Sequence, residues 1–374
     1  MRHSVKRIAR ALARAMGRRA VVVGALLGAL CAGCGGGGPD GSAGLPWDTS
    51  ARIPPAPVDM NDSVIAARAD LGRLLFYDTM LSVDGETACA TCHSEFWGMG
   101  DGLPLAIGHG AGLLAGPGRK GPNVLTRNAP SLWNAAYRKD LFWDGRAHSL
   151  EEQAMQPLDA TNELDLNPGA LVAKIRMVPG YVERFGEAFP DDAAPVSEDN
   201  VAKAIAIFER TIVSRRAPYD AFFSGDPLAM TESQQAGMQV FADAGCADCH
   251  TPPLFESDRY FDRGIGDGSD PGRYDVTRDE ADRGAFRVRT LRNLFDTRPY
   301  FHDGSVRTPE AAIQHELDRS GFDYTPEQLD ELVDFIIKGL YDPLAEPVRP
   351  DTLPSGFPTP FDGLHIVRPT GAFD

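Results

Sequence analysis

Two short cysteine motifs constrain this chain more than any other feature. Residues 89–93 read CATCH and residues 246–250 read CADCH, so both follow the pattern C-x-x-C-H. Two thiols one helical turn apart can each form a thioether to a haem, and the adjacent histidine then becomes the proximal iron ligand. The sequence therefore predicts two covalently bound c-type haems, with iron ligands His93 and His250 and attachment through Cys89, Cys92, Cys246 and Cys249.

Three other interpretations of these cysteines are open. Two disulfides suit an exported protein but do not explain a histidine after both pairs. A structural zinc site would bring the four thiolates together. A thioredoxin-like redox pair would lie in a βαβ context, and no such pattern is visible here.

The N-terminal 33 residues have the pattern of a bacterial export signal. Seven arginines and lysines precede a short apolar run over residues 21–30, which is too short to span a bilayer as a helix. Cys34 follows Ala and Gly as in a lipoprotein signal, although Cys31 stands where leucine is usual. Lipidation of Cys34 and simple release into the periplasm are both open, and residues 34–58 form a flexible tether.

The charge of the chain restricts its partners. The formal charge is −16, and removal of the seven basic signal residues takes it to −23. Such a protein is not expected to bind nucleic acid, and its contact with a membrane would be limited to an N-terminal lipid. The acidity serves either a basic partner or solubility.

The two motifs belong to an internal repeat. Residues 71–78 and 236–243 precede them with apolar residues at helical spacing, so each haem is expected to follow an amphipathic helix. About fifty residues later the likeness returns as LFWDG and YFHDG, which places Trp143 and His302 at equivalent positions. The pattern predicts a mainly α-helical fold of two cytochrome c-like haem domains packed face to face.

The expected boundaries follow from this repeat. The N-terminal haem domain covers residues 59–222, the C-terminal haem domain residues 223–345, and a proline-rich tail residues 346–374. A long helix is expected from residue 199 or 200 to about 214, capped by Ser197. Residues 217–227 are expected to be the hinge and residues 258–283 a loop.

In combination, several strings resemble the bacterial diheme cytochrome c peroxidase family, which includes the MauG-type enzymes. The resemblance covers about residues 59–345, and the matching strings are residues 71–78, 127–130, 142–146, 282–286 and 299–304. It implies an oxidoreductase that reduces hydrogen peroxide at the N-terminal haem with electrons from the C-terminal haem. A small periplasmic donor protein or an oxidised protein substrate would supply those electrons. The alternative is a non-enzymatic electron-transfer or redox-sensing cytochrome.

The resemblance also assigns catalytic roles. Trp143 resembles the tryptophan that relays electrons between the haems, while Gln153 and Glu163 match the polar residues above the peroxidatic iron. A carboxylate there can move a proton between the peroxide oxygens, and an amide can position the bound oxygen. The alternative is a core aromatic and two solvated polar residues.

Further ligands follow from the same resemblance. Asn128, Thr297 and Pro299 resemble residues that hold a calcium ion through one amide and two carbonyl oxygens, although they could simply shape turns. His109 matches the histidine that blocks the peroxidatic iron in resting members, which must be reduced before it leaves. The glycine-rich residues 110–126 could instead carry His109 away.

The second haem departs from the family pattern. The family places a methionine or a tyrosine on its far side, whereas this chain has Glu316 there and no methionine after Met238. His315 is the better iron ligand, but neighbouring helix positions point about 100° apart, so His315 and Glu316 cannot both face the haem. Tyr324 is a third candidate. The missing methionine favours a MauG-like oxidant over a plain cytochrome c peroxidase.

Overall fold

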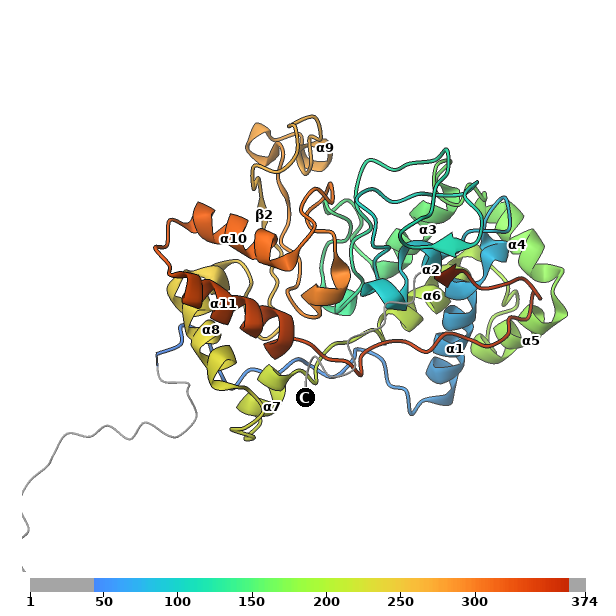
Figure 1. Ribbon diagram of the computed structural model, residues 1–374. Helices are drawn as coiled ribbons and strands as arrows, with labels where there is room; N and C mark the ends of the chain where they lie inside the picture. Colours follow the sequence, from blue (N-terminus) through green and yellow to red (C-terminus); the bar gives the residue numbers. More distant parts are fainter. Residues whose placement is uncertain (1–43, 363–374) are drawn as a thin grey trace, which may run out of the picture. The chain divides into compact units, whose positions relative to one another are not determined.

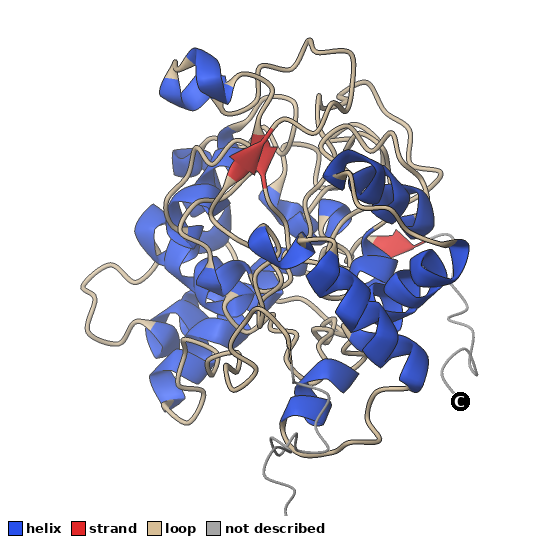
Figure 2. Cartoon of the chain, turned by 90° about the vertical axis from the view of Figure 1, so that its left-hand side faces the viewer, coloured by secondary structure: helices blue, strands red, loops and turns tan. Residues whose placement is uncertain are grey.

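The computed structural model describes residues 44–362, and within them the chain is mainly helical (Figure 1). Its strands are two residues long and form two small sheets, which appear as short arrows in Figure 2. This confirms the predicted mainly α class. No helix of residues 44–362 is both long and apolar enough to cross a bilayer. The predicted export signal, Cys34 and the end of the tail lie outside the described residues.

The elements follow one another along the chain in the order that Figure 1 labels. The α-helices are α1 Ser63–Tyr77, α2 Cys89–Cys92, α3 Leu150–Asp159, α4 Pro168–Arg176, α5 Pro179–Ala188, α6 Glu198–Glu209, α7 Pro218–Phe223, α8 Glu232–Asp243, α9 Tyr274–Thr277, α10 Pro309–Ser320 and α11 Pro326–Asp334, followed by a π-turn at Phe335–Gly339. Strand β1 (Leu114–Ala115) pairs in parallel with β4 (Phe361–Asp362), and β2 (Tyr260–Phe261) pairs antiparallel with β3 (Phe286–Arg287).

Two hydrophobic cores lie beside the two cysteine motifs, and each contains one tightly packed helix pair. In the first core α1 crosses α6 at Gly72, where an added Cβ would lie 1.9 Å from the carbonyl oxygen of Ala204. In the second core α8 crosses α11 at Gly237, where an added Cβ would lie 1.9 Å from the carbonyl oxygen of Glu331. Only glycine permits so close an approach of two helix backbones.

The turns after each motif are also repeated. Asn134 and Asn293 adopt positive φ angles of 59° and 55°. The side chain of Asn134 exchanges hydrogen bonds with the backbone of Ser214, and the side chain of Asn293 does the same with Asp342. Phe142 and Phe301, at equivalent places in the LFWDG and YFHDG strings, both have φ of 67°. The sequence repeat is therefore a structural repeat.

Two expected boundaries change. The helix capped by Ser197 is α6, and it ends at Glu209 instead of near residue 214. Residues beyond Glu209 leave the helix, because the backbone N–H of Ser214 donates instead to Oδ1 of Asn134 at 2.9 Å. The expected hinge at residues 217–227 contains α7, whose Asp220 accepts from the N–H of Ala217 at 2.9 Å.

The described part of the tail crosses back to the first core. Arg349 donates from Nε to Oε1 of Glu95 at 2.7 Å, and Leu353 is buried among residues of the first core. At its end, β4 pairs with β1, which lies just after the first cysteine motif. The segment that sequence composition marks as a proline-rich tail thus becomes part of the N-terminal core.

Candidate active site

The first cysteine motif borders a cavity of about 590 Å³ that Cys92 and His93 line. Helix α2 brings Cys89 and Cys92 one turn apart, and the N–H of His93 donates to the carbonyl oxygen of Cys89 at 2.9 Å. Nδ1 of His93 lies 3.0 Å from the carbonyl oxygen of Met99. A carbonyl only accepts, so Nδ1 carries the proton and Nε2 is left for a metal. Burial lowers the pKa of His93 to about 4, which keeps the ring neutral.

The same cavity is lined by the two predicted catalytic polar residues. Gln153 lies in α3, whose cap Ser149 accepts from the N–H of Glu152 at 3.1 Å. Glu163 follows in a turn closed by its own N–H to the carbonyl oxygen of Ala160 at 3.0 Å. Burial raises the pKa of Glu163, and the positive charge of Arg146 only partly opposes this. The structure thus brings His93, Gln153 and Glu163 around one space.

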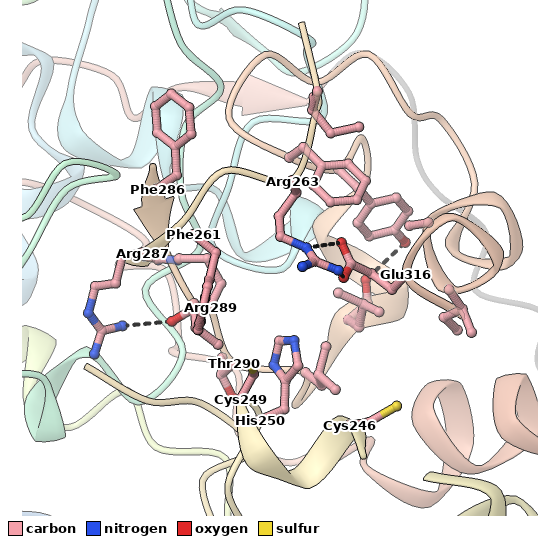
Figure 3. A pocket seen from close by; sticks show the side chains of 18 of the residues that line it. Cys246, Cys249, His250, Phe261, Arg263, Phe286, Arg287, Arg289, Thr290 and Glu316 are labelled. Atoms are coloured by element: carbon pink, nitrogen blue, oxygen red, sulfur yellow. Dashed lines mark hydrogen bonds and ion pairs between the residues drawn. The ribbon is translucent and has the colours of Figure 1, made fainter. Parts of the chain in front are cut away.

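The second motif repeats the arrangement beside a cavity of about 740 Å³ (Figure 3). The N–H of His250 donates to the carbonyl oxygen of Cys246 at 2.9 Å, and Nδ1 lies 3.2 Å from the carbonyl oxygen of Phe255. Burial lowers the pKa of His250, as it does for His93. Both histidines therefore present a neutral ring with Nε2 available.

Glu316 and His315 have different positions relative to this second cavity. Glu316 lines it and forms an ion pair with Arg263, with Nε and Oε1 3.1 Å apart. In Figure 3 this pair faces the open space above the His250 ring. His315 is not among the lining residues, and its Nε2 lies 3.0 Å from the carbonyl oxygen of Arg263. Tyr324 donates to Asp318 at 2.7 Å, and it too is outside the lining.

Trp143 lines both cavities and so marks the place where they meet. Its Nε1 donates to the carbonyl oxygen of Asn128 at 2.9 Å, and its ring lies edge-on to Phe286 with centroids 6.5 Å apart. Its counterpart His302 lines only the second cavity and stacks on Phe286 at 3.6 Å. The two copies of the aromatic turn thus differ in residue and in the cavities that they line.

The remaining predicted ligands are placed in two ways. Asn128, Thr297 and Pro299 all line the second cavity, and the Asn128 amide nitrogen donates to the carbonyl oxygen of Leu103 at 2.7 Å, which leaves the amide oxygen for a ligand. His109 is not among the residues that line the first cavity. Its Nε2 lies 3.2 Å from the carbonyl oxygen of Thr161.

Sequence reasoning missed Arg289, which also lines both cavities. Its guanidinium lies 5.5 Å over the Trp143 ring and donates to the carbonyl oxygen of Ser131 at 2.6 Å. The sequence signal was present as three arginines at positions 287, 289 and 292, between the second motif and the YFHDG string. Nothing in that spacing shows that the middle one faces two cavities.

The cysteine chemistry fits haem attachment better than the alternatives. The structure has Cys89, Cys92, Cys246 and Cys249 as free thiols. Cys92 lines the first cavity and Cys246 and Cys249 line the second, so the four thiols are not gathered at one place as a structural zinc site would require. Within residues 44–362 no group of three or more histidine, cysteine or acidic residues is arranged to hold a metal ion. Paired thiols, a neutral imidazole and an adjacent cavity are what a c-type haem requires.

Comparisons with known proteins agree with this chemistry. The family model described as di-haem cytochrome c peroxidase matches residues 66–227. Cytochrome c551 peroxidase of Pseudomonas aeruginosa is 34% identical over 276 residues, which is 71% of this chain and 77% of that protein. Methylamine utilization protein MauG of Methylophilus methylotrophus is 35% identical over 282 residues, or 73% and 79% of the two chains.

A solved structure shows the same fold. It is described as a MauG-like protein associated with microbial copper homeostasis, and it aligns with a TM-score of 0.68 at 27% identity over 80% of this chain and 97% of that chain. The present chain belongs to the di-haem cytochrome c peroxidase family. It is therefore an oxidoreductase, and membership implies two c-type haems. The non-enzymatic alternative is set aside on this ground.

Proposed function

We propose that this protein reduces hydrogen peroxide at the haem held by His93, with electrons relayed through Trp143 from the haem held by His250. One observation carries the proposal: Gln153 and Glu163 line the His93 cavity, and Trp143 lines both cavities. The two haem domains, residues 59–222 and 223–345, would then face each other across Trp143.

The residues of the first cavity divide the work between proton transfer and positioning. When bound, the haem supplies the iron at which the O–O bond of peroxide is cleaved. Glu163 takes the proton from the inner peroxide oxygen and returns it to the outer one, which then leaves as water. Gln153 orients the bound oxygen with its amide. Two electrons and two further protons complete the reduction of peroxide to two waters.

The second cavity distinguishes this chain from a plain cytochrome c peroxidase. We propose that Glu316 rather than His315 stands over the second haem, because Glu316 lines the cavity and His315 is held by the Arg263 carbonyl outside it. The pairing of Glu316 with Arg263 also supports this assignment. Without a methionine ligand, the chain suits MauG-like oxidation of a protein partner, with a small periplasmic electron donor as the second source of electrons.

The first haem is proposed to have an open site. Nε2 of His109 is engaged near Thr161 and lies 3.0 Å from Nδ2 of Asn123 and 3.9 Å from Oδ2 of Asp165. These contacts hold the ring away from the His93 cavity. Peroxide would then react with the fully oxidised protein, and prior reduction would not accelerate it.

A calcium ion is proposed at Asn128, Thr297 and Pro299. The support is that all three line one cavity and that Asn128 is buried with its amide oxygen available. Asn128 and Thr297 come from different halves of the chain, so chelation should loosen their contact and lower activity reversibly. Full activity in metal-free buffer, with no calcium found by elemental analysis, would contradict this.

The cellular location is proposed from residues outside the described range. The predicted signal supports export to the periplasm, and Cys34 supports a lipid anchor. Incorporation of labelled palmitate by the parent but not by Cys34→Ala would establish the anchor. Equal labelling of both proteins, or none, would leave the export prediction alone.

Haem counting and peroxide turnover together test the function. The protein matured with a c-type system should show two haems in a pyridine haemochrome assay, and Cys246→Ala should lose covalent attachment of one. The two-haem protein should consume peroxide with a reduced donor. A two-haem protein that does not react with peroxide would refute the proposed function while leaving the haem assignment intact.

A further inference from the structure

Three arginines form a cluster between the two cavities: Arg138, Arg287 and Arg289. Arg138 lines the first cavity, Arg287 lines the second, and Arg289 lines both. The side chains of Arg138 and Arg287 are each only 1% exposed. The arginine cluster therefore lies inside the protein and at the junction of both proposed haem sites.

The carboxylates around the arginine cluster balance only two of its three charges. Glu256 lies 3.0 Å from Arg138 and 3.6 Å from Arg287, and Asp258 lies 2.7 Å from Arg287. Asp258 is 36% exposed. Arg289 donates instead to the uncharged carbonyl of Ser131, and no ion pair of Arg289 with a carboxylate occurs within residues 44–362.

Without a bound anion, a charged Arg289 is energetically unfavourable at this position. Burial, together with the neighbouring charges of Arg138 and Arg287, holds the pKa of Arg289 well below its usual range. An arginine nevertheless stays protonated in proteins, and an unpaired charge in the interior is strongly unfavourable. The fold therefore leaves one positive charge that an anion in the adjacent cavities must compensate.

The two cavities identify the class of that anion. Each c-type haem is bound through its vinyl groups, so its two propionate carboxylates remain available. A guanidinium has five donors in a planar fork and can hold carboxylates on more than one side. We propose that Arg289 binds one propionate of each haem, with Arg138 assisting at the first haem and Arg287 at the second.

Arg289 would then act on both haems at once. A positive charge beside a propionate stabilises the reduced haem relative to the oxidised one, so it raises the reduction potential. One shared guanidinium should therefore shift both potentials together. Because it also lies over Trp143, it is a positioning residue for the electron path and does not itself carry electrons.

The test compares Arg289→Gln with two single-cavity controls. Arg146 lines only the first cavity and Arg263 only the second, so Arg146→Gln and Arg263→Gln should each affect one haem at most. After haem counting, redox titration followed by visible spectroscopy gives both potentials. Arg289→Gln should lower the equilibrium constant for reduction of both haems by about tenfold, the size expected for one charge about 12 Å from the iron at an effective dielectric near 20.

Two outcomes overturn the proposal. One is an Arg289→Gln protein with two haems in which only one potential, or neither, has changed.

If that variant does not retain its haems, Arg289→Lys keeps the charge but replaces the fork by a single ammonium. The propionate bending bands of both haems in resonance Raman spectra should then differ from the parent, and unchanged bands would be the second contrary outcome. Neither measurement uses peroxide, so each is independent of the proposed function.

Discussion

The two halves of this protein share a scaffold and differ in what stands over each proposed haem. Both have a glycine-packed helix pair, an asparagine turn and a histidine whose Nδ1 faces a carbonyl oxygen. Between the aromatic turn and the partner helix, however, the first half inserts α3, α4 and α5, whereas the second half has α10. The repeated parts carry the paired cysteines and their histidine, and the parts that are not repeated supply Gln153 to the first cavity and Glu316 to the second.

The largest contrast is expected at the two glutamates. Glu163→Gln should keep both haems but slow the reaction with peroxide by about 100-fold or more, because a general acid/base is lost. Glu316→Gln, in the other half, should leave this step within about twofold. Stopped-flow mixing with peroxide measures both, and equal effects of the two substitutions would remove the proposed division between the halves.

The shared scaffold is tested by its two glycines. Gly72→Ala and Gly237→Ala each place a Cβ 1.9 Å from a backbone oxygen of the partner helix, so each should destabilise its half by about 3 kcal/mol, at the upper end for overpacking. Gly186, with open space around it in α5, provides the control as Gly186→Ala. Urea unfolding of the two-haem proteins measures the loss. A decrease in the free energy of unfolding of less than about 1 kcal/mol at either glycine would show that this helix pair can move apart.

A smaller effect is expected at the second haem. With Glu316 over the iron, His315→Ala should leave the spin state and visible spectrum of that haem unaltered, whereas Glu316→Ala should change them. Magnetic circular dichroism of the oxidised protein reads both. A haem that turns high-spin in His315→Ala would instead show His315 as the ligand and α10 in a shifted register.

The smallest effect concerns one buried carboxyl that the halves do not share. Burial raises the pKa of Glu209 to about 8. In the second half, the equivalent position next to Phe335 is occupied by the buried Ile336. Between about pH 4.5 and 8, Glu209 therefore keeps a proton in the folded state that it has lost in the unfolded state. The free energy of unfolding falls as the pH rises through this window.

Replacing that carboxyl should remove the pH dependence. Glu209→Gln should be nearly as stable as the parent at pH 5 and more stable than the parent at pH 9. The exposed Glu187→Gln makes the same charge change and serves as the control. Thermal unfolding at both pH values measures this. A constant difference across the range would mean that Glu209 does not titrate on unfolding.

The sequence predicted those features that depend on local pattern. The C-x-x-C-H motifs and the helices before them need only near neighbours, and the repeat of LFWDG and YFHDG predicted two equivalent turns. The different contacts of His315 and Glu316 could not be predicted, because both involve Arg263, which is 53 residues from Glu316 along the chain. The end of α6 was misplaced for the same reason, since Asn134 lies 80 residues from Ser214.

Long-range contacts also account for what sequence reasoning missed. Arg289 has significance only because two cavities meet at its side chain, and no spacing along the chain reveals this. The tail was expected to be loop from its prolines, yet Arg349 reaches Glu95, 254 residues away. Composition describes how a segment behaves alone and does not show which surface it will cover.

The returning tail connects the second half back to the first. The chain leaves the first core after Ile212, builds the second core, and comes back to bury Leu353 in the core that it left. Both ends of the second half are therefore anchored, and cutting the connection at residues 217–227 alone would not release it. Two attachments restrict rotation far more than one hinge does. Two chain connections thus join the halves whose cavities both include Trp143 in their lining.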